Sequence, residues 1–282
     1  LLIMAFFDKK YSAKILLFGE YSIIKGGAAL AFPLQNYSGH WHFDNNSNNE
    51  NLFAWANYID KIQQVKTVDF QINTQRFRKD LEKGLYFKSD IPIGFGVGSS
   101  GALCAALYDE YSVEGTTIVA KNETIFTLKQ IFQSLENFFH GSSSGIDPLI
   151  CYLNAPLLLK GKTDASLISL KSSNKNNSAV FLLNTHQPRQ TEPLVNFFLE
   201  QLKGDIFTEK FENEWCLYNE NVVQAFLNKN YTVFFKNLNL LSKFQFEYLP
   251  PMIPKGFATI WEKSLQSNIF TLKLCGAGGG GF

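Results

Sequence analysis

The amino-acid sequence predicts an α+β fold. Strand-like segments dominate the first part of the chain and helix-like segments dominate the part that follows. The polar stretch SSNKNNS at 172–178 separates two halves, so we place a domain boundary there, with domains at 1–175 and 176–282. The apolar fraction of 45% is that of an ordinary globular protein and supports a real core.

The strands are expected where short apolar runs rich in β-branched or aromatic residues are bounded by polar or glycine-containing turns. The first strand is expected at 11–18 (YSAKILLF), and the segment 22–32 is expected to form a turn followed by a second strand. Further strands are expected at 66–72 and 84–88, and a polar loop at 44–51. In the second half, a strand is expected at AVFLLN (179–184), and the last strand is expected at 270–275.

Two helices are expected in the first half. A run of small residues from Ser99 to Tyr111 suits a closely packed helix that follows a glycine-rich turn at 92–98. A second helix covers 124–139, because apolar residues recur there at spacings of three and four, namely Ile125, Leu128, Phe132, Leu135 and Phe139. The part of the chain after AVFLLN is helix-rich.

Charge and composition exclude several classes of protein. Lys plus Arg number 26 and Asp plus Glu 25, so the net charge of +1 predicts neither nucleic acid nor an anionic membrane as partner. No run approaches the roughly 18 apolar residues of a membrane span, and the N-terminal LLIMAFF lacks the basic region of a signal peptide. The four cysteines form no C-x-x-C pair, which predicts reduced thiols in a cytoplasmic protein. His40 and His42 have no third ligand nearby, so a structural zinc site is not expected.

The segment PIGFGVGSSGA at 92–102 carries the first chemical signal. Glycines at 94, 96 and 98 let the backbone approach a ligand, and a helix starting near Ser99 adds free amides that favour phosphate. The alternative is a simple turn with Ser99 as the helix N-cap. Gly98 stands where a Walker A loop needs lysine. Gly96-x-Gly98-x-x-Gly101, with Glu123 after TTIVAKN, satisfies a bare dinucleotide-binding pattern, although Pro92 interrupts the strand that should precede it.

The second signal is KILLFGEY at 14–21. A strand that is apolar on both faces is buried, so Lys14 at its start lies either at the rim or facing a site. Gly19 then breaks the strand, and Glu20 presents a carboxylate at its end.

The third signal is ENFFHGSSSGIDP at 136–148. Glu136 lies in the last turn of a helix, and Asp147 follows a Gly/Ser turn across which the two carboxylates can converge. The alternative for Asp147 is an N-cap with Pro148 at the first helical position. Together, a phosphate cradle, acidic metal ligands and an acid or base beside an acceptor hydroxyl are what phosphoryl transfer requires.

With these motifs in this order the chain resembles the GHMP kinases, the family of galactokinase, homoserine kinase, mevalonate kinase and phosphomevalonate kinase. The loop is similar to the family's P-x-G-x-G-L-G-S-S-A-A, and the terminal KLCGAGGGGF is similar to its third motif. Two stretches resemble mevalonate kinases in particular. FHGSSSGIDP is similar to H-G-x-P-S-G-x-D, with Ser143 where Pro is usual, and LLNTHQPRQTEPLV is similar to N-T-x-x-P-R-x-T-x-x-L-V.

The resemblance implies two lobes, the first like ribosomal protein S5 and the second ferredoxin-like, with ATP and acceptor between them. It implies an ATP- and Mg²⁺-dependent kinase for a small alcohol, namely the 5-hydroxyl of mevalonate in isoprenoid precursor synthesis. Asp147 would be the catalytic acid/base, assisted by Lys14, and Ser100 and Glu136 would hold Mg²⁺. The ATP phosphates would contact Pro92, Gly94, Gly96, Val97, Gly98, Ser99, Ser100 and Gly101. The acceptor would contact Lys14, Glu20, Tyr21, Asp147, Gly276, Ala277, Gly278 and Arg189.

Some residues depart from the family pattern. Tyr21 stands where mevalonate kinases usually have His and is more typical of phosphomevalonate kinases, so phosphomevalonate kinase and other GHMP kinases stay open as alternatives. A non-catalytic ligand sensor of the same fold is a further alternative, and a homodimer is left open. Ser12-Ala13-Lys14 replaces the family's P-G-K. The strand and helix that follow the third motif are absent from the sequence, so we expect the natural chain to continue beyond Phe282.

Overall fold

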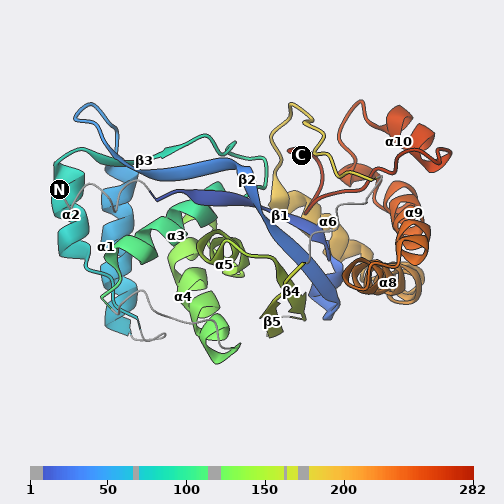
Figure 1. Cartoon of the computed structure of the whole chain (residues 1–282), viewed down its shortest axis with the longest axis horizontal. Helices are drawn as coiled ribbons and strands as arrows, with labels where there is room; N and C mark the ends of the chain where they lie inside the picture. Colours follow the sequence, from blue (N-terminus) through green and yellow to red (C-terminus); the bar gives the residue numbers. More distant parts are fainter. Residues whose placement is uncertain (1–8, 66–69, 114–121, 162–163, 171–177) are drawn as a thin grey trace.

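One antiparallel sheet organises the molecule (Figure 1). The computed structural model describes residues 9–65, 70–113, 122–161, 164–170 and 178–282. The five strands are β1 (Tyr11–Phe18), β2 (Ala28–Phe43), β3 (Leu85–Ser89), β4 (Leu157–Lys160) and β5 (Asp164–Leu167). β2, with 16 residues, pairs with β1, β3 and β4, and β5 pairs with β4. β2 therefore joins all parts of the sheet.

The helices of the first half lie on one face of this sheet (Figure 1). They are α1 (Glu50–Val65), α2 (Thr74–Glu82), α3 (Ser99–Tyr111), α4 (Asn122–His140) and α5 (Ile146–Leu153). α3 and α5 contact each other and β1. Gly101 permits this close packing, because a Cβ there would lie 2.9 Å from the backbone of Asp147. The first turn of α3 is thus held against the first turn of α5.

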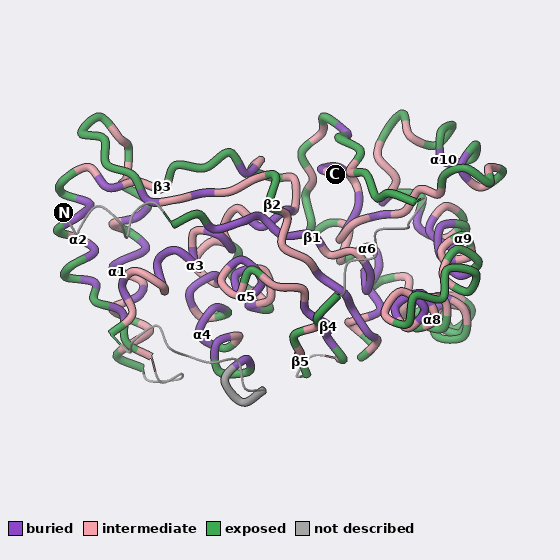
Figure 2. The backbone as a smooth tube through the Cα atoms, viewed as in Figure 1, coloured by how far each residue is buried: buried purple, intermediate pink, exposed green. Residues whose placement is uncertain are grey.

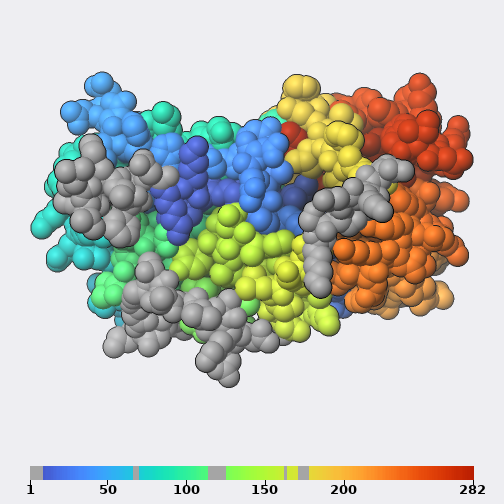
Figure 3. Space-filling view, viewed as in Figure 1, coloured from blue at the N-terminus to red at the C-terminus, as the bar shows by residue number. Residues whose placement is uncertain are grey.

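The second half is helical in its assigned structure and packs at one end of the molecule (Figure 3, orange to red). Its helices are α6 (Thr191–Gln201), α7 (Asp205–Lys210), α8 (Cys216–Leu227), α9 (Tyr231–Tyr248) and α10 (Ala258–Leu265). A π-helical turn, Phe211–Trp215, joins α7 to α8, and the short 3-10 helices Ser22–Lys25 and Pro250–Met252 complete the set.

Two buried clusters form the core (Figure 2). The first lies between the sheet and α1 to α5 and contains Trp41, Trp55 and Phe132. The second lies among the C-terminal helices and includes Phe211 and Trp215 together with Phe18, Leu30 and Leu158 of the sheet. The C-terminal helices therefore pack on the strands of the first half. The domain boundary at 175/176 stays a prediction.

Several predicted elements are confirmed. The strand at 11–18 and the helix from Ser99 to Tyr111 have the predicted bounds, and the strand at 84–88 lies within a residue of β3. The helix predicted at 124–139 lies within α4, and four of its five periodic residues are at most 2% exposed. The antiparallel sheet shows that the dinucleotide-fold alternative is wrong. TTIVAKN lies mostly outside the described residues, as does the connection at 172–178.

The two strands predicted in the second half are wrong. Neither AVFLLN at 179–184 nor 270–275 pairs with another described segment, and neither has assigned secondary structure. A strand exists only where a neighbouring backbone supplies hydrogen bonds, and that neighbour is not visible in a local pattern. A ferredoxin-like sheet is consequently absent from the described residues 178–282.

Two helices, α1 and α2, and the full length of β2 were not predicted from the sequence. α1 begins inside the predicted polar loop at Glu50, and its Leu52, Trp55, Ala56 and Ile59 are buried at helical spacing. α2 follows it. β2 continues beyond residue 32 to Phe43. Pro33 lies within this strand, opposite Lys14 of β1, and does not end it. Of the strand predicted at 66–72, residues 66–69 lie outside the described residues, and Ile72 forms only an isolated bridge.

The structure also bears on the predictions about membranes and cysteines. Among the described helices none is both long and apolar enough to cross a membrane. All four cysteines are free thiols.

Candidate active site

The glycine loop between β3 and α3 adopts a conformation that favours glycine. Gly94, Gly96 and Gly98 have φ angles of 79°, 71° and 79°, in the left-handed region that side-chain-bearing residues rarely adopt. Gly98 is the N-cap of α3, so the interpretation of Ser99 as the cap is wrong. The first amides of a helix have no intrahelical acceptor, and here the cap offers no side chain to satisfy them. Pro92 precedes these glycines, and Val97, between Gly96 and Gly98, is buried in the core. The loop therefore presents backbone donors suited to an anion.

Lys14 of β1 lies directly against this loop. Its backbone N–H donates to the carbonyl oxygen of Val97 at 2.9 Å, and a Cβ on Gly98 would lie 2.8 Å from its Cγ. Lys14 is only 6% exposed, which shows that the rim interpretation is wrong. Its ammonium lies 2.7 Å from Oδ2 of Asp147, whose side chain is 36% exposed. Two residues far apart in the sequence thus form one ion pair beside the loop.

Asp147 is not the helix cap. The N-cap of α5 is Gly145 with φ of 71°, which makes Asp147 the second residue of the helix and Pro148 the third. Gly145 is required there, since a Cβ would lie 2.1 Å from the carbonyl oxygen of Lys129 in α4. The packing of α5 against α4 therefore moves the start of the helix two residues earlier and leaves the Asp147 carboxylate for Lys14.

Glu136 is the second carboxylate of the site and is 4% exposed. Ser100 Oγ donates to its Oε1 at 2.9 Å, and Ser143 Oγ donates to its Oε2. Burial, and then the charge of Asp147, raises the pKa of Glu136 to about 7, against the two serine hydrogen bonds and Lys14, which act to lower it. The convergence of Glu136 and Asp147 across the Gly/Ser turn is as predicted.

Ser100 and Glu136 fit an octahedral divalent cation. Their oxygens are 2.9 Å apart, which is about the spacing of adjacent ligands on an ion with bonds near 2.1 Å. Mg²⁺ commonly takes one or two protein oxygens and completes its shell with phosphates and water. The described residues contain no group of three or more His, Cys, Asp or Glu side chains that could hold a metal alone. The donor set therefore suits a cation that arrives with a phosphate.

Glu20 and Tyr21 contact the terminal glycine loop. The Glu20 carboxylate is buried in an ion pair with Lys273, and burial raises its pKa although Lys273 opposes the shift. Tyr21 donates its hydroxyl to the carbonyl oxygen of Ala277 at 2.8 Å, and burial raises its pKa as well. Both side chains thus tie the end of β1 to the last residues of the chain.

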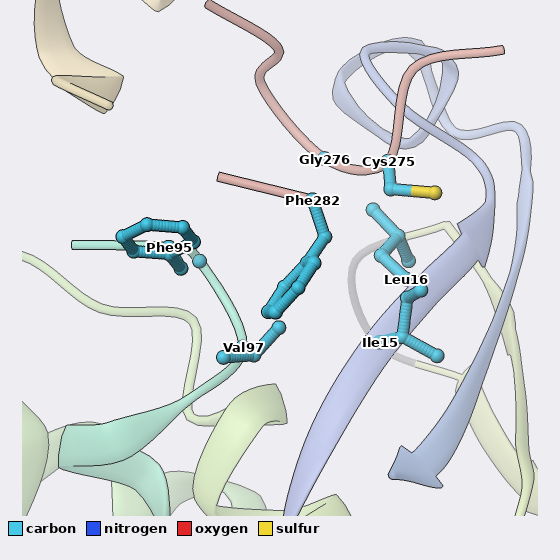
Figure 4. Close-up of a pocket in the computed structure, with 8 residues that line it drawn as sticks. Ile15, Leu16, Phe95, Val97, Cys275, Gly276 and Phe282 are labelled. Atoms are coloured by element: carbon cyan, nitrogen blue, oxygen red, sulfur yellow. The ribbon is translucent and has the colours of Figure 1, made fainter. Parts of the chain in front are cut away.

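The terminal glycine loop lies on the glycine loop between β3 and α3. A Cβ on Gly281 would lie 2.4 Å from the carbonyl oxygen of Phe95, and Thr185 Oγ1 donates to the carbonyl oxygen of Gly281 at 2.8 Å. Gly276 and Gly278 have φ angles of 75° and 76°. Figure 4 shows the ring of Phe282 pointing into a small hollow lined by Ile15, Leu16, Phe95, Gly96, Val97, Cys275 and Gly276. The first and last motifs therefore meet around one hollow.

Arg189 lies between these two loops. Its backbone N–H donates to the carbonyl oxygen of Gly94 at 2.9 Å, and its Nη1 donates to that of Cys275 at 3.0 Å. A Cβ on Gly96 would overlap its guanidinium. Its Nε is buried without a partner, and burial lowers its pKa while the charge of Asp147 raises it. The guanidinium is therefore held near Asp147 with donors left over.

Three residues of the site were missed by sequence reasoning. His140 Nε2 lies 2.9 Å from Ser100 Oγ, Ser143 bonds Glu136, and Lys273 neutralises Glu20. His140 and Ser143 lie in FHGSSSG, within the 136–148 motif, so their place in that motif could have identified them as site residues. Lys273 had no local signal, because its role depends on a partner at the other end of the chain.

Comparison with known proteins identifies similar folds and one matching family. Residues 57–155 match the GHMP kinases N-terminal domain family. No curated protein matches the chain. Among solved structures, L. major mevalonate kinase in complex with R-mevalonate is 14% identical, with TM-score 0.59 over 96% of this chain and 84% of that one. Lactococcus lactis galactokinase complexed with galactose is 17% identical, with TM-score 0.58 over 98% and 84%. Methanococcus jannaschii mevalonate kinase is 17% identical, with TM-score 0.55 over 97% and 88%.

At these identities the matches show the fold alone, and the matched enzymes are complexed with different small molecules, mevalonate in one and galactose in the other. The match over 57–155 and the likeness of nearly the whole chain confirm the predicted resemblance: the protein has the GHMP kinase fold, and residues 57–155 match the N-terminal domain of that family.

Proposed function

We propose that the protein is an ATP-dependent kinase that phosphorylates the 5-hydroxyl of mevalonate. The observation that carries the proposal is the 2.7 Å ion pair between Lys14 and Asp147 next to the glycine loop. Ligand binding alone does not require a carboxylate paired with a buried lysine at this position, so the pair favours a catalyst over a sensor. The GHMP kinase N-terminal domain supports the phosphotransferase class.

Each part of the site has a role in this reaction. The amides at the start of α3 and the loop backbone bind the phosphates of ATP. Asp147 accepts the proton of the acceptor hydroxyl as its oxygen bonds to the γ-phosphorus of ATP and the bond from that phosphorus to the leaving ADP breaks. Lys14 orients the Asp147 carboxylate and offsets negative charge on the phosphoryl group. Ser100 and Glu136 would hold Mg²⁺, which would neutralise phosphate charge.

The choice of acceptor is based on charge. Of the three cationic side chains that the described residues bring to this site, Lys14 and Lys273 are ion-paired, whereas Arg189 bonds a neutral carbonyl. One cation with spare donors suits an alcohol that carries a single carboxylate, such as mevalonate. Phosphomevalonate carries an additional phosphate and would need further cations. We therefore assign the carboxylate of the acceptor to Arg189.

The proposed function is tested by ADP release in a coupled assay with mevalonate, phosphomevalonate, galactose and homoserine. We expect release with mevalonate to exceed release with the other three alcohols. Clear release with another alcohol and none with mevalonate would overturn the acceptor assignment. No release with any alcohol, despite measurable ATP binding, would favour the sensor.

Replacing Arg189 with Lys should raise the KM for the acceptor about tenfold or more, because one bond to a charged group contributes about 1.5–3 kcal/mol and lysine lacks the planar fork. The KM for ATP should change little. Arg78→Lys is the matched control, since Arg78 pairs with Asp60 in a different part of the fold. A rise confined to the KM for ATP would contradict the assignment of Arg189 to the acceptor.

A further inference from the structure

Ser143 is held in place by three hydrogen bonds. Its Oγ donates to Glu136 Oε2 and accepts the N–H of Gly145 at 3.0 Å. Its own N–H donates to Oδ1 of Asn137 at 2.7 Å. The hydroxyl is therefore fixed both as donor and as acceptor, and it connects the end of α4 to the N-cap of α5.

A carboxylate needs such a contact to be oriented. The last torsion of a glutamate side chain is broad, so hydrogen bonds rather than a rotamer well set the plane of its oxygens. Ser100 holds Oε1 of Glu136 and Ser143 holds Oε2. Without Ser143, Oε2 would lose this partner and the carboxylate could rotate away from the arrangement in which Oε1 lies 2.9 Å from Ser100 Oγ.

The residue at 143 distinguishes this chain from the segment that it resembles, in which proline is usual. Proline has neither a hydroxyl nor a backbone N–H, so it could make neither the bond to Glu136 nor the bond to Asn137. The hydrogen bonds from residue 143 to Glu136 and Asn137 therefore depend on the serine that this chain has there.

We propose that Ser143 is a positioning residue that fixes the Glu136 carboxylate in the orientation that binds the divalent cation. The inference rests on the proposed function. Through Gly145, the same hydroxyl also links Glu136 to the helix that carries Asp147, so the metal ligand and the proton acceptor are held by one connection.

The test is Mn²⁺ affinity, measured without turnover by the electron paramagnetic resonance signal of free Mn²⁺, on protein saturated with the non-hydrolysable ATP analogue AMP-PNP. Ser143→Ala should weaken Mn²⁺ binding about tenfold or more, as loss of a residue that orients a ligand typically does. Ser143→Thr, which keeps the hydroxyl, should restore most of the affinity. Ser144→Ala is the matched control and should bind as wild type, because the one hydrogen bond of the Ser144 side chain among the described residues is from the N–H of Ile146 in the same turn, and not from Glu136.

The outcomes separate this inference from the proposed function. If Glu136→Gln weakens Mn²⁺ binding and Ser143→Ala does not, the role of Ser143 is overturned and the metal site stands. Equal losses in the Ala and Thr variants would also overturn it, because the loop conformation rather than the hydroxyl would then matter. If Glu136→Gln binds Mn²⁺ as wild type does, the metal site of the proposed function fails, and this inference fails with it.

Discussion

Replacing Asp147 with Asn is expected to lower kcat by about 10²-fold or more while ATP still binds, because the amide cannot accept the proton of the acceptor hydroxyl. Asn has nearly the same shape, so α5 and its packing on α3 should persist. The stability cost should stay near 1 kcal/mol or below, since the carboxylate is 36% exposed and its ion pair with Lys14 is partly solvated. Turnover, ATP affinity and the melting temperature are to be measured together.

Asp109→Asn provides the control for loss of an ion pair. Asp109 lies 2.6 Å from the ammonium of Lys9 and also accepts the hydroxyl of Tyr11, outside the glycine loop and the Glu136 site. This variant should lose stability and keep its kcat. Near-normal turnover in Asp147→Asn would remove Asp147 from the mechanism and reduce the Lys14–Asp147 pair to a structural contact.

Glu136→Gln is expected to change activity and stability in opposite directions. The pKa of Glu136 is about 7 in the folded protein, against an ordinary value of 4.5 in the unfolded chain. A raised pKa favours the protonated form on folding, so its stabilising contribution is complete below pH 4.5 and is lost as the pH rises through 7. The loss is about 3 kcal/mol above pH 7. A neutral glutamine avoids it.

The metal-free Gln variant should therefore melt above wild type at pH 8 and close to it at pH 4.5. Its amide group also fits, since Ser143 can donate to the oxygen while Ser100 accepts from the NH₂ and donates to His140. Activity should fall about 10- to 100-fold through weaker Mg²⁺ binding and recover partly with more Mg²⁺ or with Mn²⁺. Unchanged activity at low Mg²⁺ would show that Glu136 is not a ligand. An unchanged melting temperature at pH 8 would contradict the raised pKa.

Several features of this protein follow from local sequence, because the signal and its cause lie in the same segment. The alternating glycines of the 92–98 loop imply positive φ angles, which Gly94, Gly96 and Gly98 adopt. The spacing of apolar residues from Ile125 to Phe139 implies one buried helix face, as α4 has. The same reasoning would have found α1, whose buried residues follow that spacing.

Other features depend on neighbours that are distant in sequence. AVFLLN has the composition of a strand but pairs with nothing described. Asp147 followed by Pro148 has the pattern of a cap, yet the carbonyl of Lys129 admits only glycine at 145 and shifts the helix start. Glu20 is buried beside a cationic partner only because Lys273 reaches it, and Lys14 faces Asp147 only because α5 packs on β1. Local sequence limits the conformations a segment can adopt and the chemistry its side chains can perform. Hydrogen-bond partners and burial, which set charge state and orientation, come from segments that only the folded chain brings together.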